Sequence, residues 1–185
     1  MRRRALLTAS GGGVTPIDFV TFDGSTIFDT GVYGDHNIYI EVKFRRTSTA
    51  SNVYLYGVST SPRLTANLAQ SGYWRYSESA YPTFNTKNTN VTEAQVTPTK
   101  TKVGSYSKTY SSGAFTTKFT IPLGGHTPSS GVPTPQFIGE VYYFRVYKRI
   151  GSSGIGYLCN WTPAKNADGV EGFWDNVTNK FIAPL

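Results

Sequence analysis

The sequence predicts an all-β protein of two packed antiparallel sheets, and three observations support this. First, it is rich in aromatic residues, with 13 Tyr, 11 Phe and 3 Trp, the residue types that strands favour. Second, 19 Gly and 10 Pro are spread along the 185 residues, as expected for many short strands joined by turns. Third, two long segments alternate apolar and polar residues, as strands with one buried face do. We therefore expect one β-sandwich domain, because single sandwiches often reach this length.

The two alternating segments predict which side chains face the core. In residues 36–46, the apolar face carries Ile38, Ile40, Val42 and Phe44, and the polar face carries Asn37, Tyr39, Glu41, Lys43 and Arg45. In residues 136–148, the pattern predicts that Ile138, Tyr142, Phe144 and Val146 face the core, with Val141, Tyr143, Arg145 and Tyr147 on the other side. Both segments are typical of half-buried sandwich strands.

Shorter strands and turns complete the predicted order. The tail from residue 168 onward predicts a hairpin in which residues 170–174 pair with 180–183 across residues 176–179. No repeat of 20–50 residues occurs, which argues against solenoids and propellers. Further strands are predicted at residues 53–58, 63–69, 73–77, 100–106 and 114–120, and the turn signals Asp23-Gly24, Ser61-Pro62, Ser71-Gly72 and Ser112-Gly113 flank them.

The N-terminal residues 1–16 predict a flexible arm in front of a domain at residues 17–185. The arm is basic, then Gly-rich, and Pro16 closes it. Its apolar stretch is too short for the central region of a signal peptide, so we expect no export, and no stretch is long enough to span a membrane. The candidate anchoring residues are Arg2, Arg3, Arg4, Leu6 and Leu7, which suit an acidic, partly apolar groove. The alternative is a frayed terminus without a partner.

The net charge of +7 favours anionic partners. Three of the 18 basic residues belong to the arm, and the others show no basic cluster, so a nucleic-acid partner is not expected. Cys159 is the only cysteine, which excludes an intramolecular disulfide. Its neighbours Leu158 and Trp161 favour a buried apolar role over that of a nucleophile.

The acidic residues do not predict an active site. Glycosidases need two carboxylates across the sugar, but Glu41 and Glu140 each lack a second acid two residues along the strand. Asp168, Glu171 and Asp175 resemble turn and edge residues of the terminal hairpin. We therefore expect no enzyme, no cofactor and no His/Cys metal site. A structural calcium stays an open alternative, because calcium takes oxygen ligands from loops and four aspartates lie early in the chain, at Asp18, Asp23, Asp29 and Asp35.

One aromatic segment is a candidate for glycan contact. Tyr73, Trp74, Arg75 and Tyr76 are consecutive, and Tyr81 follows closely. Flat rings flanked by hydrogen-bonding side chains bind sugar rings. The alternative is that the same rings pack in the core of the sandwich.

The C-terminal third resembles a known family. Residues 137–147 read FIGEVYYFRVY, residues 157–164 read YLCNWTPA, and residues 168–175 read DGVEGFWD, followed by Lys180-Phe181. This is similar to the laminin-G-like, concanavalin A-like jelly-roll domains of phage virion proteins and of gut-bacterial or prophage surface proteins. The resemblance covers residues 17–185, and it is weakest between Tyr81 and Gly125. It implies a jelly-roll sandwich. The same segments also have a plain physical interpretation, in which Gly139 and Gly172 mark close backbone approaches or bulges.

The resemblance also implies a function. It suggests a virion accessory protein, such as a head, fibre or tail decoration, anchored by its arm and presenting the sandwich for surface or glycan adhesion. The partners would be other virion proteins, further copies of the chain in a homo-oligomer such as a trimer, and host-surface glycans. The alternative is a carbohydrate-binding module of a bacterial surface protein. Fold motifs alone do not decide between them.

Overall fold

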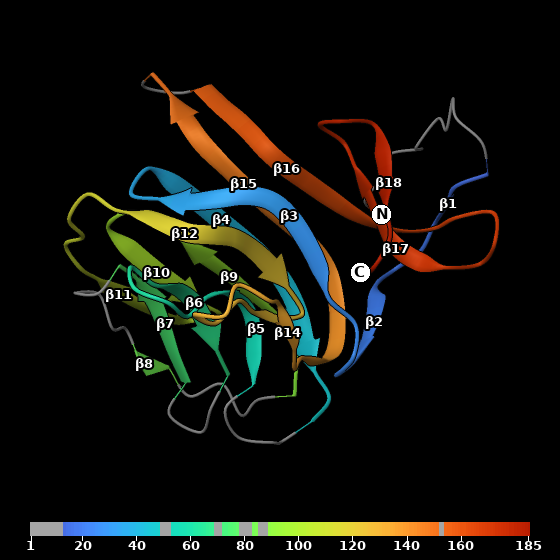
Figure 1. Cartoon of the computed structure of the whole chain (residues 1–185), viewed down its shortest axis with the longest axis horizontal. Coiled ribbons are helices and arrows are strands. Elements are labelled where there is room, and N and C mark those ends of the chain that lie inside the picture. Colours follow the sequence, from blue (N-terminus) through green and yellow to red (C-terminus); the bar gives the residue numbers. More distant parts are fainter. Residues whose placement is uncertain (1–12, 49–52, 69–71, 78–82, 85–88, 152–153) are drawn as a thin grey trace.

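The protein is all-β in the part of the chain that the structure describes. The computed structural model (Figure 1) describes residues 13–48, 53–68, 72–77, 83–84, 89–151 and 154–185. These residues form strands and no helix, which confirms the predicted all-β class. Within these ranges there is accordingly no helix long and apolar enough to cross a membrane.

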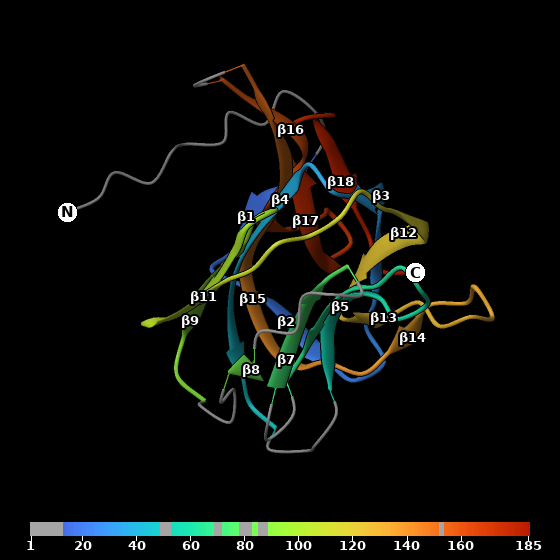
Figure 2. The same cartoon turned by 90° about the vertical axis from the view of Figure 1, so that its left-hand side faces the viewer.

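The described residues form two antiparallel sheets, with one small strand pair beside them. Figure 2 shows β4, β9 and β15 on one side and β5, β7 and β12 on the other. The ten-stranded sheet has the order β11-β10-β9-β4-β15-β16-β17-β18, and β1 and β2 pair with β16 and β15; the six-stranded sheet has the order β3-β12-β5-β6-β7-β8.

The strands are divided between the two sheets and the small pair. In the ten-stranded sheet they are β1 Thr15–Pro16, β2 Val20–Asp23, β4 Ile38–Arg46, β9 Thr92–Val96, β10 Lys100–Val103, β11 Tyr106–Thr109, β15 Ile138–Ile150, β16 Gly154–Lys165, β17 Glu171–Asp175 and β18 Lys180–Ile182. In the six-stranded sheet they are β3 Phe28–Asp35, β5 Tyr54–Val58, β6 Leu64–Asn67, β7 Gly72–Tyr76, β8 Thr83–Phe84 and β12 Thr116–Leu123, and the small pair is β13 Gly125–His126 with β14 Thr134–Pro135.

The core lies between the two sheets. The inward side chains of β4 are at most 3% exposed, so the alternation in residues 36–46 predicted their facing correctly. They share one apolar cluster with Leu55 and Tyr56 of the second sheet. The Tyr56 ring lies 5.7 Å from the ring of Phe144 on β15. Each fully buried large apolar side chain contributes about 1.5–3 kcal/mol to stability.

The predicted facing of β15 is correct for Phe144 and Val146 and wrong for Tyr142. Val141 is fully buried, whereas Tyr142 is only partly buried and lies outside the core cluster. The pairing with β4 shifts between Val141 and Tyr143, so Tyr142 is an extra residue in the strand. Such a β-bulge reverses the parity of the residues before it. Ile138 therefore shares no face with Phe144.

The close backbone approaches predicted at Gly139 and Gly172 are present. A Cβ atom on Gly139 would lie 2.2 Å from the carbonyl oxygen of Arg45, and one on Gly172 would lie 2.3 Å from that of Ile182. The terminal hairpin also forms as predicted, with Phe173 opposite Ile182.

The predicted segment 100–106 is two strands rather than one. β10 and β11 form a hairpin that turns at Gly104, whose φ of +58° is a conformation that favours glycine. The strands β9 and β16 had no counterpart among the predicted elements.

The sheet begins inside the segment predicted as the arm. Thr15 and Pro16 pair with Lys165 and Ala164 of β16, and the amide of Ile17 donates to the carbonyl of Pro163 at 3.2 Å. The boundary predicted at residue 16 therefore moves to a point before Thr15. The candidate anchoring residues from Arg2 to Leu7 lie outside the described residues.

Candidate functional site

The aromatic segment predicted to contact glycans lies largely in the core. Trp74 is 1% exposed and Tyr76 is fully buried. The Tyr76 hydroxyl donates to the Ile38 carbonyl at 2.9 Å. This burial removes both rings from any ligand-binding surface. Arg75 is partly buried, and the side chain of Tyr73 and the whole of Tyr81 lie outside the described residues.

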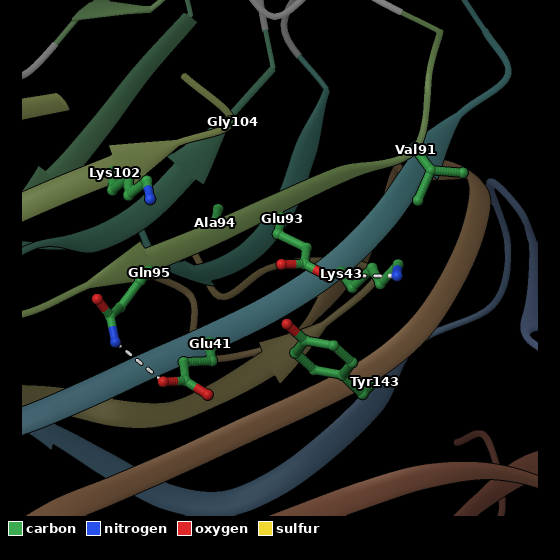
Figure 3. Close-up of a pocket in the computed structure, with 9 residues that line it drawn as sticks. All are labelled: Glu41, Lys43, Val91, Glu93, Ala94, Gln95, Lys102, Gly104 and Tyr143. Atoms are coloured by element: carbon green, nitrogen blue, oxygen red, sulfur yellow. Dashed lines mark hydrogen bonds and ion pairs between the residues drawn. The ribbon is translucent and has the colours of Figure 1, made fainter. Parts of the chain in front are cut away.

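A different face of the protein carries a hollow with polar walls. It measures about 570 Å³ and lies on the outer face of the ten-stranded sheet, over β4, β9, β10 and β15 (Figure 3). The side chains of β4 that point away from the core form its floor, and Tyr143, which pairs with Lys43 and alternates with the inward Phe144, lies on the same face. The hollow is lined by Glu41, Lys43, Val91, Glu93, Ala94, Gln95, Lys102, Gly104 and Tyr143.

Glu41 is the centre of a hydrogen-bond network at one end of the hollow. Its Oε1 accepts from Gln95 Nε2 at 2.9 Å and from the Tyr147 hydroxyl at 2.8 Å, and its Oε2 lies 3.5 Å from Arg145 Nη1. Burial, and then the bond to Glu41, raise the pKa of Tyr147 to about 12. Because several strands hold the carboxylate, its position is fixed before any ligand arrives.

At the other end of the hollow lie an ion pair and an aromatic ring. Lys43 Nζ lies 3.2 Å from Glu93 Oε1, and Figure 3 shows this pair beside the ring of Tyr143. The guanidinium carbon of Arg145 lies 4.5 Å from the centre of that ring, a cation–π contact. Burial, and then the charge of Glu93, raise the pKa of Tyr143. The phenol therefore stays protonated at neutral pH and is a hydrogen-bond donor.

The chemistry of this surface is balanced between donors and acceptors. Lys43, Lys102 and Gln95 donate, whereas Glu41 and Glu93 accept, and Tyr143 adds an apolar ring. Two carboxylates thus line one hollow, and the spacing of acids along single strands does not predict this pair. Glu41 and Glu93 come from neighbouring strands, and each contacts a cation.

Two further acids singled out in the sequence, Glu140 and Asp175, hold strands together. Glu140 pairs with Arg45 and accepts from the Tyr142 hydroxyl at 2.6 Å. Asp175 is buried, and its carboxylate accepts from the amide of Asn160 at 3.0 Å and from the hydroxyl of Thr178 at 2.7 Å.

Aspartates early in the chain accept hydrogen bonds from residues of the adjacent turns. Asp23 accepts from the amide and hydroxyl of Ser25, and these bonds lower its pKa. Asp29 accepts from the amide of Gly31 at 3.0 Å. Within the described ranges, no group of three or more His, Cys, Asp or Glu side chains comes together as a metal site would require. The described residues therefore offer no candidate set of calcium ligands.

Cys159 is buried, as predicted. Its burial raises the pKa of the thiol well above the ordinary value. The thiolate, which is the nucleophilic form, is therefore disfavoured.

Comparison with known proteins assigns the chain to no family. No family model matches the chain, and a search of curated proteins finds no match. The outer face of the ten-stranded sheet is thus the feature from which a function is inferred.

Proposed function

We propose that this chain is a non-enzymatic binding module that holds a glycan chain on the outer face of its ten-stranded sheet. The observation that carries the proposal is the hollow over β4, β9 and β15, where fixed donors, fixed acceptors and one ring share a surface. A sugar hydroxyl both donates and accepts, so it suits a surface that offers both kinds of group. The Tyr143 ring supplies the flat apolar contact that a sugar face requires.

The charges in the hollow favour a neutral or weakly charged glycan. Lys43 is paired with Glu93, and Arg145 with Glu41, so neither sign dominates. The preorganised network around Glu41 lowers the entropic cost of binding, because the partner side chains are already ordered.

The fold family and the biological setting are part of the same proposal. The C-terminal motifs occupy β15 to β18, and their resemblance supports a concanavalin A-like jelly roll and a virion decoration anchored by residues 1–12. The alternative setting is a carbohydrate-binding module of a bacterial surface protein. A neutral-glycan site on the sheet face is compatible with both settings.

Glycan-array binding, followed by calorimetry on the best ligand, tests the proposal. Tyr143→Ala and Gln95→Ala should each weaken binding about tenfold or more, equivalent to about 1.4 kcal/mol. Tyr33→Ala is the matched control, because Tyr33 is a 55% exposed tyrosine on β3 of the other sheet. Absence of glycan binding, or equal losses in Tyr33→Ala and Tyr143→Ala, would refute the proposal. Hydrolysis of the bound glycan that Glu41→Gln or Glu93→Gln abolishes would show an enzyme instead.

A further inference from the structure

The hairpin of β15 and β16 leaves one strand edge open. It extends beyond the neighbouring strands at the upper left of Figure 1. β17 pairs with β16 only from Trp161 to Lys165, and the turn after β17 reaches Asn160. Between Gly154 and Cys159, the side of β16 that faces away from β15 has no strand partner within the described ranges. The backbone groups along this edge are thus available to another strand.

This edge lacks the charged side chains and prolines that guard strand edges, and its one irregularity is a register shift against β15 at Leu158. Soluble proteins guard free edges with charged residues, especially lysine, or with proline. The edge strand β11 contains Lys108, β18 begins at Lys180, and β3 contains Asp29 and Asp35. Residues 154–159 read GIGYLC, with neither a charge nor a proline.

The same segment exposes apolar side chains. Ile155 is 52% exposed, Leu158 is 39% exposed and Tyr157 is 37% exposed, and Ile150 on the adjacent strand is 65% exposed. An unpaired edge beside exposed apolar groups is the surface that strand addition covers, since main-chain hydrogen bonds supply affinity and the side chains supply specificity.

We propose that this edge pairs with the same edge of a second copy of the chain, antiparallel and about a two-fold axis. The two ten-stranded sheets then form one continuous sheet. A second copy fits because the edge is uncharged and apolar, so two identical segments meet without like charges at the junction. In a two-fold contact, each copy also supplies both the donors and the acceptors that the other needs.

The net charge of the chain does not oppose this pairing. The nearest basic residues, Lys148 and Arg149, lie on β15, one strand away from the junction. In the dimer, the two β15 strands are three strand spacings apart, about 14 Å. This exceeds the screening length of about 8 Å at physiological salt.

The contact should be weak and should close at two subunits. Six residues of strand are only about 20 Å long, and small interfaces of this kind are transient. We therefore expect a dissociation constant in the micromolar range. A two-fold contact is complete at two copies, which distinguishes it from the trimer that the resemblance suggested.

Sedimentation velocity of the full chain over about 1–500 μM tests the proposal. The wild type should change from monomer to dimer, and Ile155→Lys and Leu158→Lys should each raise the dissociation constant about tenfold or more. Val132→Lys is the matched control, because it adds the same charge at a residue that is 66% exposed outside the hairpin; it should leave dimerisation unchanged. In the wild type, amide protection at residues 155–158 should increase with protein concentration.

Three outcomes would overturn the proposal. The first is a wild-type monomer at every concentration, and the second is a dimer that tolerates both lysine substitutions. The third is a dimer that deletion of residues 2–12 abolishes while amides 155–158 stay unprotected, which would assign the contact to the N-terminal segment. Hydrogen exchange on the wild type decides the matter even if a lysine variant fails to fold. Glycan binding is measured separately, so the proposed function can fail or hold independently.

Discussion

The rings of Tyr39 and Tyr147 stack across β4 and β15 on the outer face of the ten-stranded sheet, with centroids 5.2 Å apart and planes 17° apart. Tyr157 packs edge-on against Tyr147 at 5.7 Å, and the Arg149 guanidinium lies 5.4 Å from the Tyr39 ring. Tyr147 is only 6% exposed as a result. The outer face therefore carries a small packed aromatic layer of its own.

The inner core and this outer aromatic layer should differ in how much stability an alanine substitution removes. Phe144→Ala should destabilise the protein by about 3–5 kcal/mol, because the ring is fully buried between the sheets. Tyr39→Ala should cost about 1–2 kcal/mol, because it removes a partly exposed ring and one stacking contact. Denaturant midpoints compare the two. Equal losses would contradict the assignment of Phe144 to the inner face and Tyr39 to the outer face.

Asp175 should be the most costly acid to remove from the terminal hairpin. Asp175→Ala leaves the partly buried amide of Asn160 and the amide and hydroxyl of Thr178 without their acceptor, at a cost of about 1–3 kcal/mol. Asp168→Ala is the control, since Asp168 is exposed and its loss should change stability by less than about 0.5 kcal/mol. Thermal midpoints of the two variants measure the difference, and similar midpoints would contradict this role for Asp175.

Stability should fall as the pH rises above 10. Folding raises the pKa of Tyr147 from 10.0 to about 12, so the folded state holds its proton more tightly than the unfolded state does. The contribution of this group to stability is complete below pH 10 and is lost between pH 10 and 12. Urea unfolding midpoints measured across this pH range check how the stability depends on pH.

Glu41→Gln tests whether the hydrogen bond to Glu41 helps to raise the pKa of Tyr147. The pKa of Tyr147 should fall toward its ordinary value without reaching it, because burial is the larger cause and remains. The ultraviolet absorbance of tyrosinate reports the titration, with Tyr147→Phe to identify the signal. An unchanged titration curve would show that Glu41 does not stabilise the protonated phenol.

Deletion of residues 2–12 tests the anchoring role predicted for the arm. The deletion keeps Gly13, whose backbone lies against Ala167, and it keeps β1. The melting midpoint should not change, whereas incorporation into a larger particle should be lost. If the truncated chain is incorporated as well as the full chain, residues 2–12 are not the anchor.

The alternation of side chains predicted β4 fully and β15 only in part, for a physical reason. β4 is uninterrupted, so one parity holds along its whole length. β15 contains the extra residue Tyr142, and a bulge is visible only once the register against β4 is known. β16 was not predicted, because Gly154, Gly156 and Pro163 break the usual strand pattern.

The sequence singled out the aromatic segment of β7, in which the rings of Trp74 and Tyr76 are buried, and it did not single out the hollow over β4, β9 and β15. An aromatic segment such as residues 74–76 has the same sequence pattern whether its rings are buried or exposed. Trp74 and Tyr76 are buried because they lie in the core between the two sheets. The pair Glu41–Gln95 is separated by 54 residues in the chain. Only the pairing of β4 with β9 makes them neighbours, and local pattern carries no information on that pairing.

The two glycines near the starts of β15 and β17, described above, limit how this sequence can diverge. No side chain fits at Gly139 or Gly172, because backbone carbonyl oxygens occupy the space that a Cβ atom would need. The exposed turns and the outer face are open to substitution, whereas these two positions are closed to it. Distant relatives should therefore keep a glycine at each position after most other identities are lost. The pair provides two fixed points for aligning sequences too divergent for overall similarity to detect.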